Sequence, residues 1–128
     1  MFQNLIMAFD FERLDVYQKA KAVNSHVYSF LKANAHLPRY IRDQLGRASL
    51  SIMLNIAEGA GRFGKKEKKQ FYTISRSSVF ECAALLDFLL GQDLIEKTLF
   101  NSLYQQFEEI SRILYRMIEN LRPPTHSH

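Results

Sequence analysis

Apolar residues recur every three or four positions through most of this chain, which is the spacing of one face of an α-helix. The pattern is interrupted at Pro38, at the glycine-rich stretch 59–64 and at Gly91. We therefore predict helical segments at about 10–33, 39–60, 65–90 and 100–121, the last of them ended by consecutive prolines.

Each segment has one predicted core stripe. From the first segment to the fourth, the stripes are Val16, Ala20, Val23, Val27 and Phe30; Ile41, Leu45, Ala48, Ile52 and Ile56; Phe71, Ile74, Ser78, Cys82, Leu85 and Leu89; and Phe100, Leu103, Phe107, Ile110, Leu114, Met117 and Leu121. Because short connections between long helices make neighbours antiparallel, we predict an all-α fold, an antiparallel up-down-up-down four-helix bundle. The bundle is expected at 10–121, between an N-terminal arm at 1–9 and a disordered tail at 122–128.

The composition fits one compact domain of 128 residues, of which 47% are apolar. The only cysteine, Cys82, excludes an internal disulfide and is consistent with a reducing compartment, so we expect a cytoplasmic protein. No uninterrupted apolar run reaches the roughly 18 residues of a membrane span. Histidines such as His26 and His36 lie far apart, and no cluster has metal-ligand spacing, so neither a metal nor a cofactor is expected.

The glycine-rich stretch matches two phosphate-loop patterns. Gly59, Gly61 and Gly64 fit the dinucleotide fingerprint, and Gly64-Lys65 completes most of a Walker A loop. However, Lys66 stands where a Walker A loop needs a hydroxyl, and no other segment reads as a parallel strand. We predict instead that these glycines end one helix and turn the chain, using the left-handed conformation that glycine tolerates.

One stretch resembles a known family. The run RASLSIMLNIAEGAGR at 47–62, followed by Phe71 and by SSVFE at 77–81, is similar to four-helix-bundle proteins encoded in intervening sequences of large-subunit ribosomal RNA genes. The resemblance covers about residues 10–121 and includes FERLDVY at 11–17. Ser77 departs from the glycine that the family usually has, which indicates slightly wider helix packing there.

The resemblance implies a small oligomeric bundle, commonly a ring of five subunits. It extends to the accessory bundle protein of diversity-generating retroelements, which binds nucleic acid and a reverse transcriptase. The implied partners are other copies of the chain in a cyclic homo-oligomer, RNA or DNA, and another nucleic-acid-processing protein. The family has no established catalytic residues, so the resemblance implies none for this chain.

Apolar residues outside the predicted stripes also point to assembly. On a monomer, Met53, Leu54, Phe80 and Phe88 would leave apolar patches, and such patches usually mark interfaces. Small residues in the second and third segments would let neighbouring backbones approach closely: Ala48, Ser51, Ala57, Ser75, Ser77 and Ser78. We therefore expect a closed homo-oligomer.

Positive charge is concentrated in one short segment. Residues 60–76 hold six basic side chains against Glu67, a net of +5, whereas the rest of the chain has 11 basic and 12 acidic residues. At about 100° per residue, Lys65, Lys69 and Arg76 fall within about 40° of one another on a helix. The predicted nucleic-acid-binding residues are Arg62, Lys65, Lys66, Lys68, Lys69 and Arg76. A solvated helix face with no ligand is the alternative.

Other side chains in this region also have two interpretations. Phe63 and Tyr72 could stack on bases, although aromatic side chains more often serve packing. Cys82 lies on a predicted core stripe and is expected to be a small core residue rather than a nucleophile.

A second group of polar residues is predicted to be structural. Asn55, Glu58 and Arg62 follow one another at one-turn spacing, and Glu81 could meet Arg47 or Arg62 from the third segment. We expect a buried or interfacial network of Arg47, Asn55, Glu58, Arg62 and Glu81 that fixes helix register and oligomeric state. The alternative is that Glu58 is a catalytic acid with an arginine partner.

The sequence therefore predicts a non-enzymatic homo-oligomeric bundle that binds nucleic acid through its basic segment. One alternative is a structural or protein-binding scaffold with no nucleic-acid role. The other is an enzyme that uses Glu58, Arg62 and the turn 59–65 on a phosphorylated substrate.

Overall fold

The computed structural model describes residues 9–123 and contains four long helices. A short 3-10 helix, η2 (Asp10–Arg13), precedes α1 (Asp15–Ala33), α2 (Arg39–Ala60), α3 (Lys65–Gly91) and α4 (Lys97–Asn120). No strand occurs in this range. The predicted arm at 1–9 and tail at 122–128 lie outside the described residues, apart from Phe9, Arg122 and Pro123.

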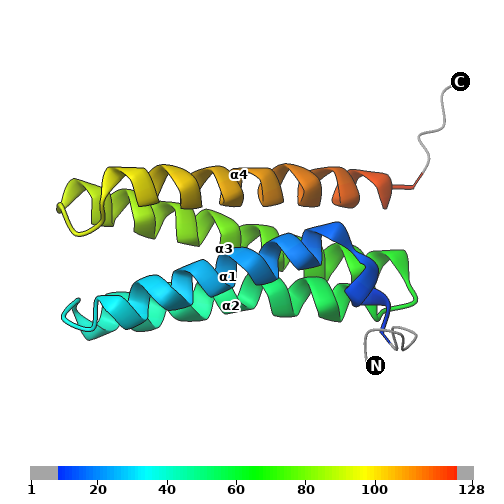
Figure 1. Ribbon diagram of the computed structural model, residues 1–128. Coiled ribbons are helices and arrows are strands. Elements are labelled where there is room, and N and C mark those ends of the chain that lie inside the picture. The colour runs from blue at the N-terminus through cyan, green and yellow to red at the C-terminus, as the bar shows by residue number, and fades with distance from the viewer. Residues whose placement is uncertain (1–8, 124–128) are drawn as a thin grey trace, which may run out of the picture.

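The helices form an antiparallel bundle in which each helix contacts its two neighbours (Figure 1). The pairs in contact are α1 with α2, α2 with α3, α3 with α4, and α4 with α1. This arrangement confirms the predicted all-α four-helix bundle. It also brings η2, the turn between α2 and α3, and the end of α4 to the same end of the bundle, which we call the Lys65 end.

Three of the four predicted core stripes are confirmed. All five predicted positions of α1 and all five of α2 are buried. In α4, Leu103, Phe107, Ile110 and Leu114 are buried, while Phe100, Met117 and Leu121 pack against the core at its margins. Helix α4 is the most regular of the four, since apolar and charged residues occupy opposite faces.

The predicted core face of α3 is wrong for half of its residues. Ser78, Cys82 and Leu89 are buried as expected, but Phe71 and Leu85 are half-buried and Ile74 is 46% exposed. The buried positions instead form an inner stripe, defined here as Tyr72, Ser75, Val79, Cys82, Leu86 and Leu89. A second series with the same spacing forms an outer stripe: Phe71, Ile74, Ser78, Glu81, Leu85 and Phe88.

Close packing between α2 and α3 explains this register. The hydroxyl of Ser75 is buried and donates to the carbonyl oxygen of Ile52 at 2.8 Å. The Tyr72 ring lies directly against Gly59, where an added Cβ would come within 2.6 Å of the ring. A glycine on α2 therefore provides the space that turns Tyr72, rather than Phe71, toward the core.

The turn between α2 and α3 does not use the left-handed glycine conformation that the sequence predicted. Gly61, the C-cap of α2, has φ −82°, and no glycine among residues 9–123 has a positive φ. The only positive value in this range belongs to Asp93, at φ 57° in the turn before α4. The carbonyl groups at the end of α2 are satisfied in another way, by Lys68.

Candidate nucleic-acid interface

Lys68 has a structural role that its place in the basic segment did not indicate. Its ammonium group donates to the carbonyl oxygens of Gly59 at 3.3 Å and Ala60 at 3.0 Å. The last carbonyls of a helix lack partners within the helix. A cation at this end also interacts favourably with the negative end of the helix dipole. Lys68 therefore caps α2 from the first turn of α3 and is half-buried.

Arg62 is also committed to contacts within the bundle. One terminal nitrogen lies 2.9 Å from a carboxylate oxygen of Glu58, and the guanidinium lies 4.7 Å from the centre of the Phe71 ring. These contacts join the end of α2 to the start of α3, so Arg62 stabilises the turn between them.

Arg76 joins α3 to α4. Its Nε donates to the backbone oxygen of Ser111 at 3.2 Å. Its guanidinium lies 5.0 Å from the centre of the Phe80 ring and 5.3 Å from that of Tyr115. Three of the six predicted phosphate contacts, Arg62, Lys68 and Arg76, are thus engaged in holding helices together.

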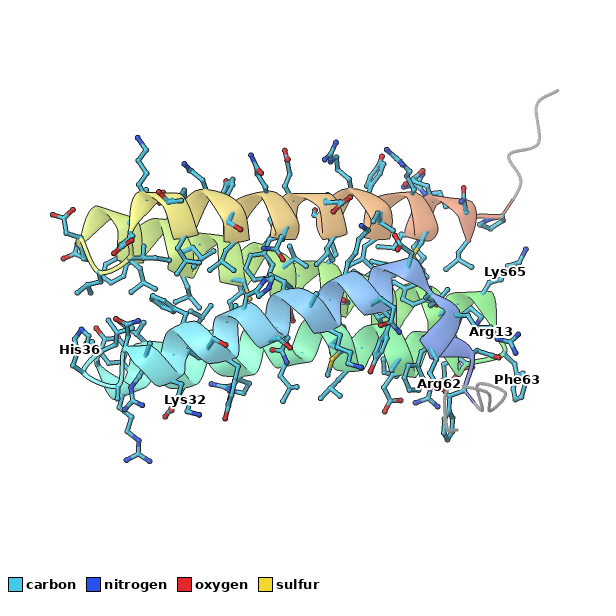
Figure 2. All side chains as sticks on the ribbon, viewed as in Figure 1. Arg13, Lys32, His36, Arg62, Phe63 and Lys65 are labelled. Carbon is cyan, nitrogen blue, oxygen red and sulfur yellow. The ribbon has the colours of Figure 1, made fainter. Side chains whose placement is uncertain are left out.

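The other three predicted residues, Lys65, Lys66 and Lys69, are exposed in the first turns of α3. None of them forms an ion pair with a carboxylate in the described part of the chain. Arg13 of η2 is also exposed and unpaired there, and Figure 2 places it at the Lys65 end. We call Arg13, Lys65, Lys66 and Lys69 the free cationic cluster.

Arg13 was missed by the sequence reasoning because it lies far from residues 60–76 in the chain. The predicted up-down topology could have revealed it. In that topology, the start of the first helical segment lies at the same end of the bundle as the turn between the second and third segments. Lys32 and His36 lie at the opposite end of the bundle (Figure 2).

The two aromatic residues considered for base stacking have opposite environments. Tyr72 is only 5% exposed, and burial raises the pKa of its hydroxyl. It is a core residue, so the stacking role considered for it is wrong. Phe63 has a relative exposure of 102% and projects from the turn between Arg62 and Lys65 (Figure 2).

The predicted polar network divides into three separate groups. Arg47 donates to Gln44 at 2.8 Å, and Gln44 donates to Glu81, so Arg47 reaches Glu81 through a residue that the prediction omitted. Asn55 donates to the backbone oxygen of Ser51 at 2.9 Å, and the Ser51 hydroxyl lies 2.9 Å from that of Ser78 on α3.

The third group is the Glu58–Arg62 pair, which does not bind Glu81. Its side chains are 56% and 41% exposed, so the pair is not buried within the bundle of a single chain. Within one chain, the five predicted residues form surface contacts along α2 and α3. The idea that they serve an interface between subunits stays a prediction.

Comparison with known proteins identifies the family. The model for the family described as 23S rRNA-intervening sequence protein matches residues 12–116. The chain belongs to this family.

A solved structure has the same fold. A protein of unknown function from the S23 ribosomal protein family of Bacteroides thetaiotaomicron is similar with a TM-score of 0.76 and 21% sequence identity. The match covers 81% of this chain and 98% of that one. No curated protein matched the chain.

Other side chains that could carry chemistry form no further site among the residues that the structure describes. Cys82 is buried, and burial, followed by the nearby Glu81 charge, raises the pKa of its thiol to about 12. Among residues 9–123, no three His, Cys, Asp or Glu side chains could hold a metal ion together. In the same range, no helix is long and apolar enough to cross a membrane. Residues 59–65 connect two helices, which is not the strand-to-helix setting of a phosphate loop.

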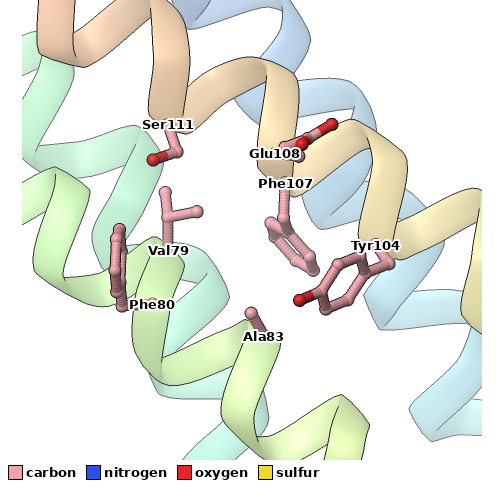
Figure 3. Close-up of a pocket in the computed structure, with 7 residues that line it drawn as sticks. All are labelled: Val79, Phe80, Ala83, Tyr104, Phe107, Glu108 and Ser111. Carbon is pink, nitrogen blue, oxygen red and sulfur yellow. The ribbon is translucent and has the colours of Figure 1, made fainter.

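The chain also has a groove of about 200 Å³ between α3 and α4 (Figure 3). Phe80 and Tyr104 stand at its sides, 58% and 44% exposed, and Phe107 forms part of its floor. Small residues, Ala83 and Ser111, leave the space between the two helices open. We call this surface the α3/α4 groove.

Proposed function

We propose that this chain is a non-enzymatic, homo-oligomeric helical-bundle module that binds nucleic acid at its Lys65 end. The free cationic cluster is the observation that supports this proposal. Four positive side chains lie at one end of the bundle, and none of them has an ion-pair partner among residues 9–123. Such a cluster suits contact with phosphates, which carry affinity without reading base sequence.

Helix stability does not account for the lysines. Residues 65 and 66 open α3, where the helix dipole is positive, and lysine there is unfavourable by a few tenths of a kcal/mol. No side chain among residues 9–123 caps this helix start, so the amide groups of the first turn add to the positive potential. A ring of subunits would repeat this potential around its axis.

Assembly is supported by apolar surface on both flanks of α3. On the flank beside α2, the outer stripe exposes Ile74 and Phe88, and Leu54 of α2 is exposed as well. On the flank beside α4, the α3/α4 groove exposes Phe80 and Tyr104. Large exposed apolar side chains in groups are typical of protein interfaces.

Two different apolar surfaces on one subunit suit a ring. In a head-to-tail contact, one surface of a subunit meets a different surface of the next, and the contacts close when the rotation completes a circle. We propose that the outer stripe of α3 packs against the α3/α4 groove of a neighbouring copy. Five is the subunit number that the family resemblance implies. A nucleic-acid-processing protein is a further proposed partner of the assembled ring.

The second candidate function is a structural or protein-binding scaffold with no nucleic-acid role. It is favoured by the same apolar surfaces and by the structural use of Arg62, Lys68 and Arg76. If a partner protein covered these surfaces, the remaining lysines would be no more than a solvated helix face.

A charge-matched comparison separates the two candidates. Variant one replaces Lys65, Lys66 and Lys69 by glutamine and leaves the structural cations in place. The control replaces Lys21, Lys32 and Lys97, which are also exposed and unpaired among the described residues. Binding to structured RNA and to DNA is measured at several salt concentrations.

We expect variant one to bind nucleic acids of every sequence more weakly than wild type. The slope of log K against log salt should fall by about 0.7–0.9 for each lost phosphate contact. The control should lose much less affinity despite its equal change in net charge. Wild-type protein that binds neither RNA nor DNA at low salt would leave the scaffold as the better account. Equal losses in both variants would also contradict a localised site.

Assembly is tested by light scattering with a matched pair of variants. Phe80→Glu places a charge in the α3/α4 groove, whereas Tyr28→Glu places one at a side chain of α1 with similar exposure, 66% against 58%. The first should disperse the oligomer and the second should not, because a carboxylate in an apolar contact loses its water and the nearby Arg76 offsets only part of that cost. A wild-type mass near 15.0 kDa at micromolar concentration would refute the assembly.

A further inference from the structure

Phe63 is the most exposed large apolar side chain among the described residues, and its surroundings are fixed. The backbone amide of Arg62 donates to the carbonyl oxygen of Gly59 at 3.2 Å, and that of Gly61 donates to Ala57 at 3.2 Å. The Arg62 side chain is anchored on Glu58 and Phe71. The turn is therefore held on both sides while the Phe63 ring stands free of the bundle.

The cations at the Lys65 end of the bundle divide into two sets. Arg62 and Lys68 hold the turn through contacts inside the bundle, so they position the ring. The free cationic cluster lies at the same end and is open to a ligand (Figure 2). A fully exposed aromatic ring at the same end of the bundle as several unpaired cations combines a stacking surface with phosphate contacts, which is the combination that binds single-stranded nucleic acid.

Most other exposed aromatic residues lack this combination. Phe9 lies at the same end and is 63% exposed, but its ring stacks on that of Phe11, with 5.8 Å between the ring centres. The rings of Phe80 and Tyr115 already contact the guanidinium of Arg76. Tyr40 opens α2, so it lies at the opposite end of the bundle from the turn that ends this helix, and it is 73% exposed.

We propose that Phe63 stacks on an unpaired base of a single-stranded segment whose phosphates contact the free cationic cluster. This inference rests on the proposed function and narrows its ligand class. A duplex keeps its bases stacked on one another, so only an unpaired base has a face for Phe63 to cover. Base stacking tolerates every base, so the site distinguishes single strands from duplexes without selecting a sequence.

The test compares the full-length wild-type protein with Phe63→Ala and Tyr40→Ala, the latter being a matched loss of an exposed aromatic ring. Each protein is titrated with a short single strand, the corresponding duplex, and a strand of equal length whose sugars carry no bases. Phe63→Ala should bind the normal single strand about tenfold more weakly than wild type. It should bind the duplex and the baseless strand as wild type does, and Tyr40→Ala should bind all three normally.

A second variant reports stacking directly. The chain contains no tryptophan, so Phe63→Trp introduces a single indole at the turn. We expect this variant to retain single-strand affinity and its fluorescence to be quenched by the normal strand but not by the baseless one. Light scattering on Phe63→Ala checks that the oligomer is unchanged.

The outcomes separate the two proposals. If the lysine variant loses binding while Phe63→Ala binds the single strand as wild type does, the cationic site stands and the stacking inference is wrong. A loss that is equal for normal and baseless strands also overturns stacking. If Phe63→Ala changes the oligomer mass without affecting binding, the ring is a contact between subunits. Wild-type protein that binds no nucleic acid overturns both proposals.

Discussion

The inner and outer stripes of α3 have the same heptad spacing and yet opposite environments. The inner stripe is buried along its whole length, whereas in the outer stripe only Ser78 is buried. The spacing shows that a helix has an apolar face, but when two such faces exist it does not show which one turns to the core. The outer stripe contains a charged residue, Glu81, and the inner stripe contains none. Burial of an unpaired carboxylate is costly, so charge is the signal that separates the two.

The largest contrast expected between the stripes concerns the thiol of Cys82 on the inner stripe. Burial raises its pKa from 9.0 to about 12, so near neutral pH the thiolate fraction falls by about a thousandfold. Native protein at pH 8 should therefore resist alkylation by iodoacetamide, and protein in denaturant should react rapidly. Mass spectrometry over time measures both rates.

The raised pKa of Cys82 also makes the stability of the fold depend on pH. Because the thiol ionises more readily in the unfolded chain, its contribution to stability is complete below about pH 9 and is lost as pH rises toward 12. Rapid alkylation of the folded protein would show that the inner stripe opens or that Cys82 lies at its surface.

Neighbouring leucines give the next largest contrast. Leu86 is fully buried on the inner stripe and Leu85 is half-buried on the outer one. Leu86→Ala should lower the free energy of unfolding by about 2–5 kcal/mol, because the cavity lies in the core. Leu85→Ala should cost less and should weaken assembly, so its effect should depend on protein concentration. Denaturant unfolding at two concentrations checks this, and a larger loss at Leu85 would reverse the assignment of the stripes.

Gly59 offers a smaller test of the inner stripe, through the Tyr72 ring. Gly59→Ala places a Cβ within 2.6 Å of that ring and should cost about 1–3 kcal/mol as overpacking. Gly61→Ala is the matched control, since its Cβ would have no neighbour closer than 3.7 Å and its φ suits alanine. Thermal unfolding of both variants measures the difference. Equal stability would mean that Tyr72 moves aside freely.

The smallest effect is expected at the Glu58–Arg62 pair at the surface. Because both side chains are largely exposed, Glu58→Gln should change the free energy of unfolding by about 0–1 kcal/mol. Asp43→Asn in the pair with Arg39 is a control of the same spacing, also largely exposed and away from the α3/α4 groove. A much larger loss at Glu58 alone, together with a lower oligomer mass, would place this pair inside an interface between subunits.

Most of the fold could be predicted because α1, α2 and α4 each have one dominant apolar stripe. Residues such as Leu45 and Phe107 lie where the spacing placed them. In α3 the prediction combined positions from both stripes, since Phe71 and Ile74 are as apolar as Tyr72. Local sequence also could not explain why residue 59 is a glycine, because the space is needed by the Tyr72 ring on the next helix.

The candidate site could be predicted only in part. The local excess of positive charge pointed to the start of α3, but the sequence could not separate the cations that hold helices together from those that are free of ion pairs. Lys68 and Lys69 are adjacent, and only the former reaches the carbonyls that end α2. That distinction depends on the angle at which α3 leaves the turn, which is a tertiary property. Arg13 joins the cluster for the same reason.

The even number of antiparallel helices has a practical consequence for experiments on this protein. Residues 10 and 123 both lie at the Lys65 end of the bundle (Figure 1). A purification tag or a fluorescent domain fused to either terminus would be tethered next to the surface under study, where a polyhistidine tag could itself attract phosphates. The turn between α3 and α4, whose residues 91–93 are exposed, lies at the far end. That turn is the better place for a dye, an epitope or an attachment point to a sensor surface.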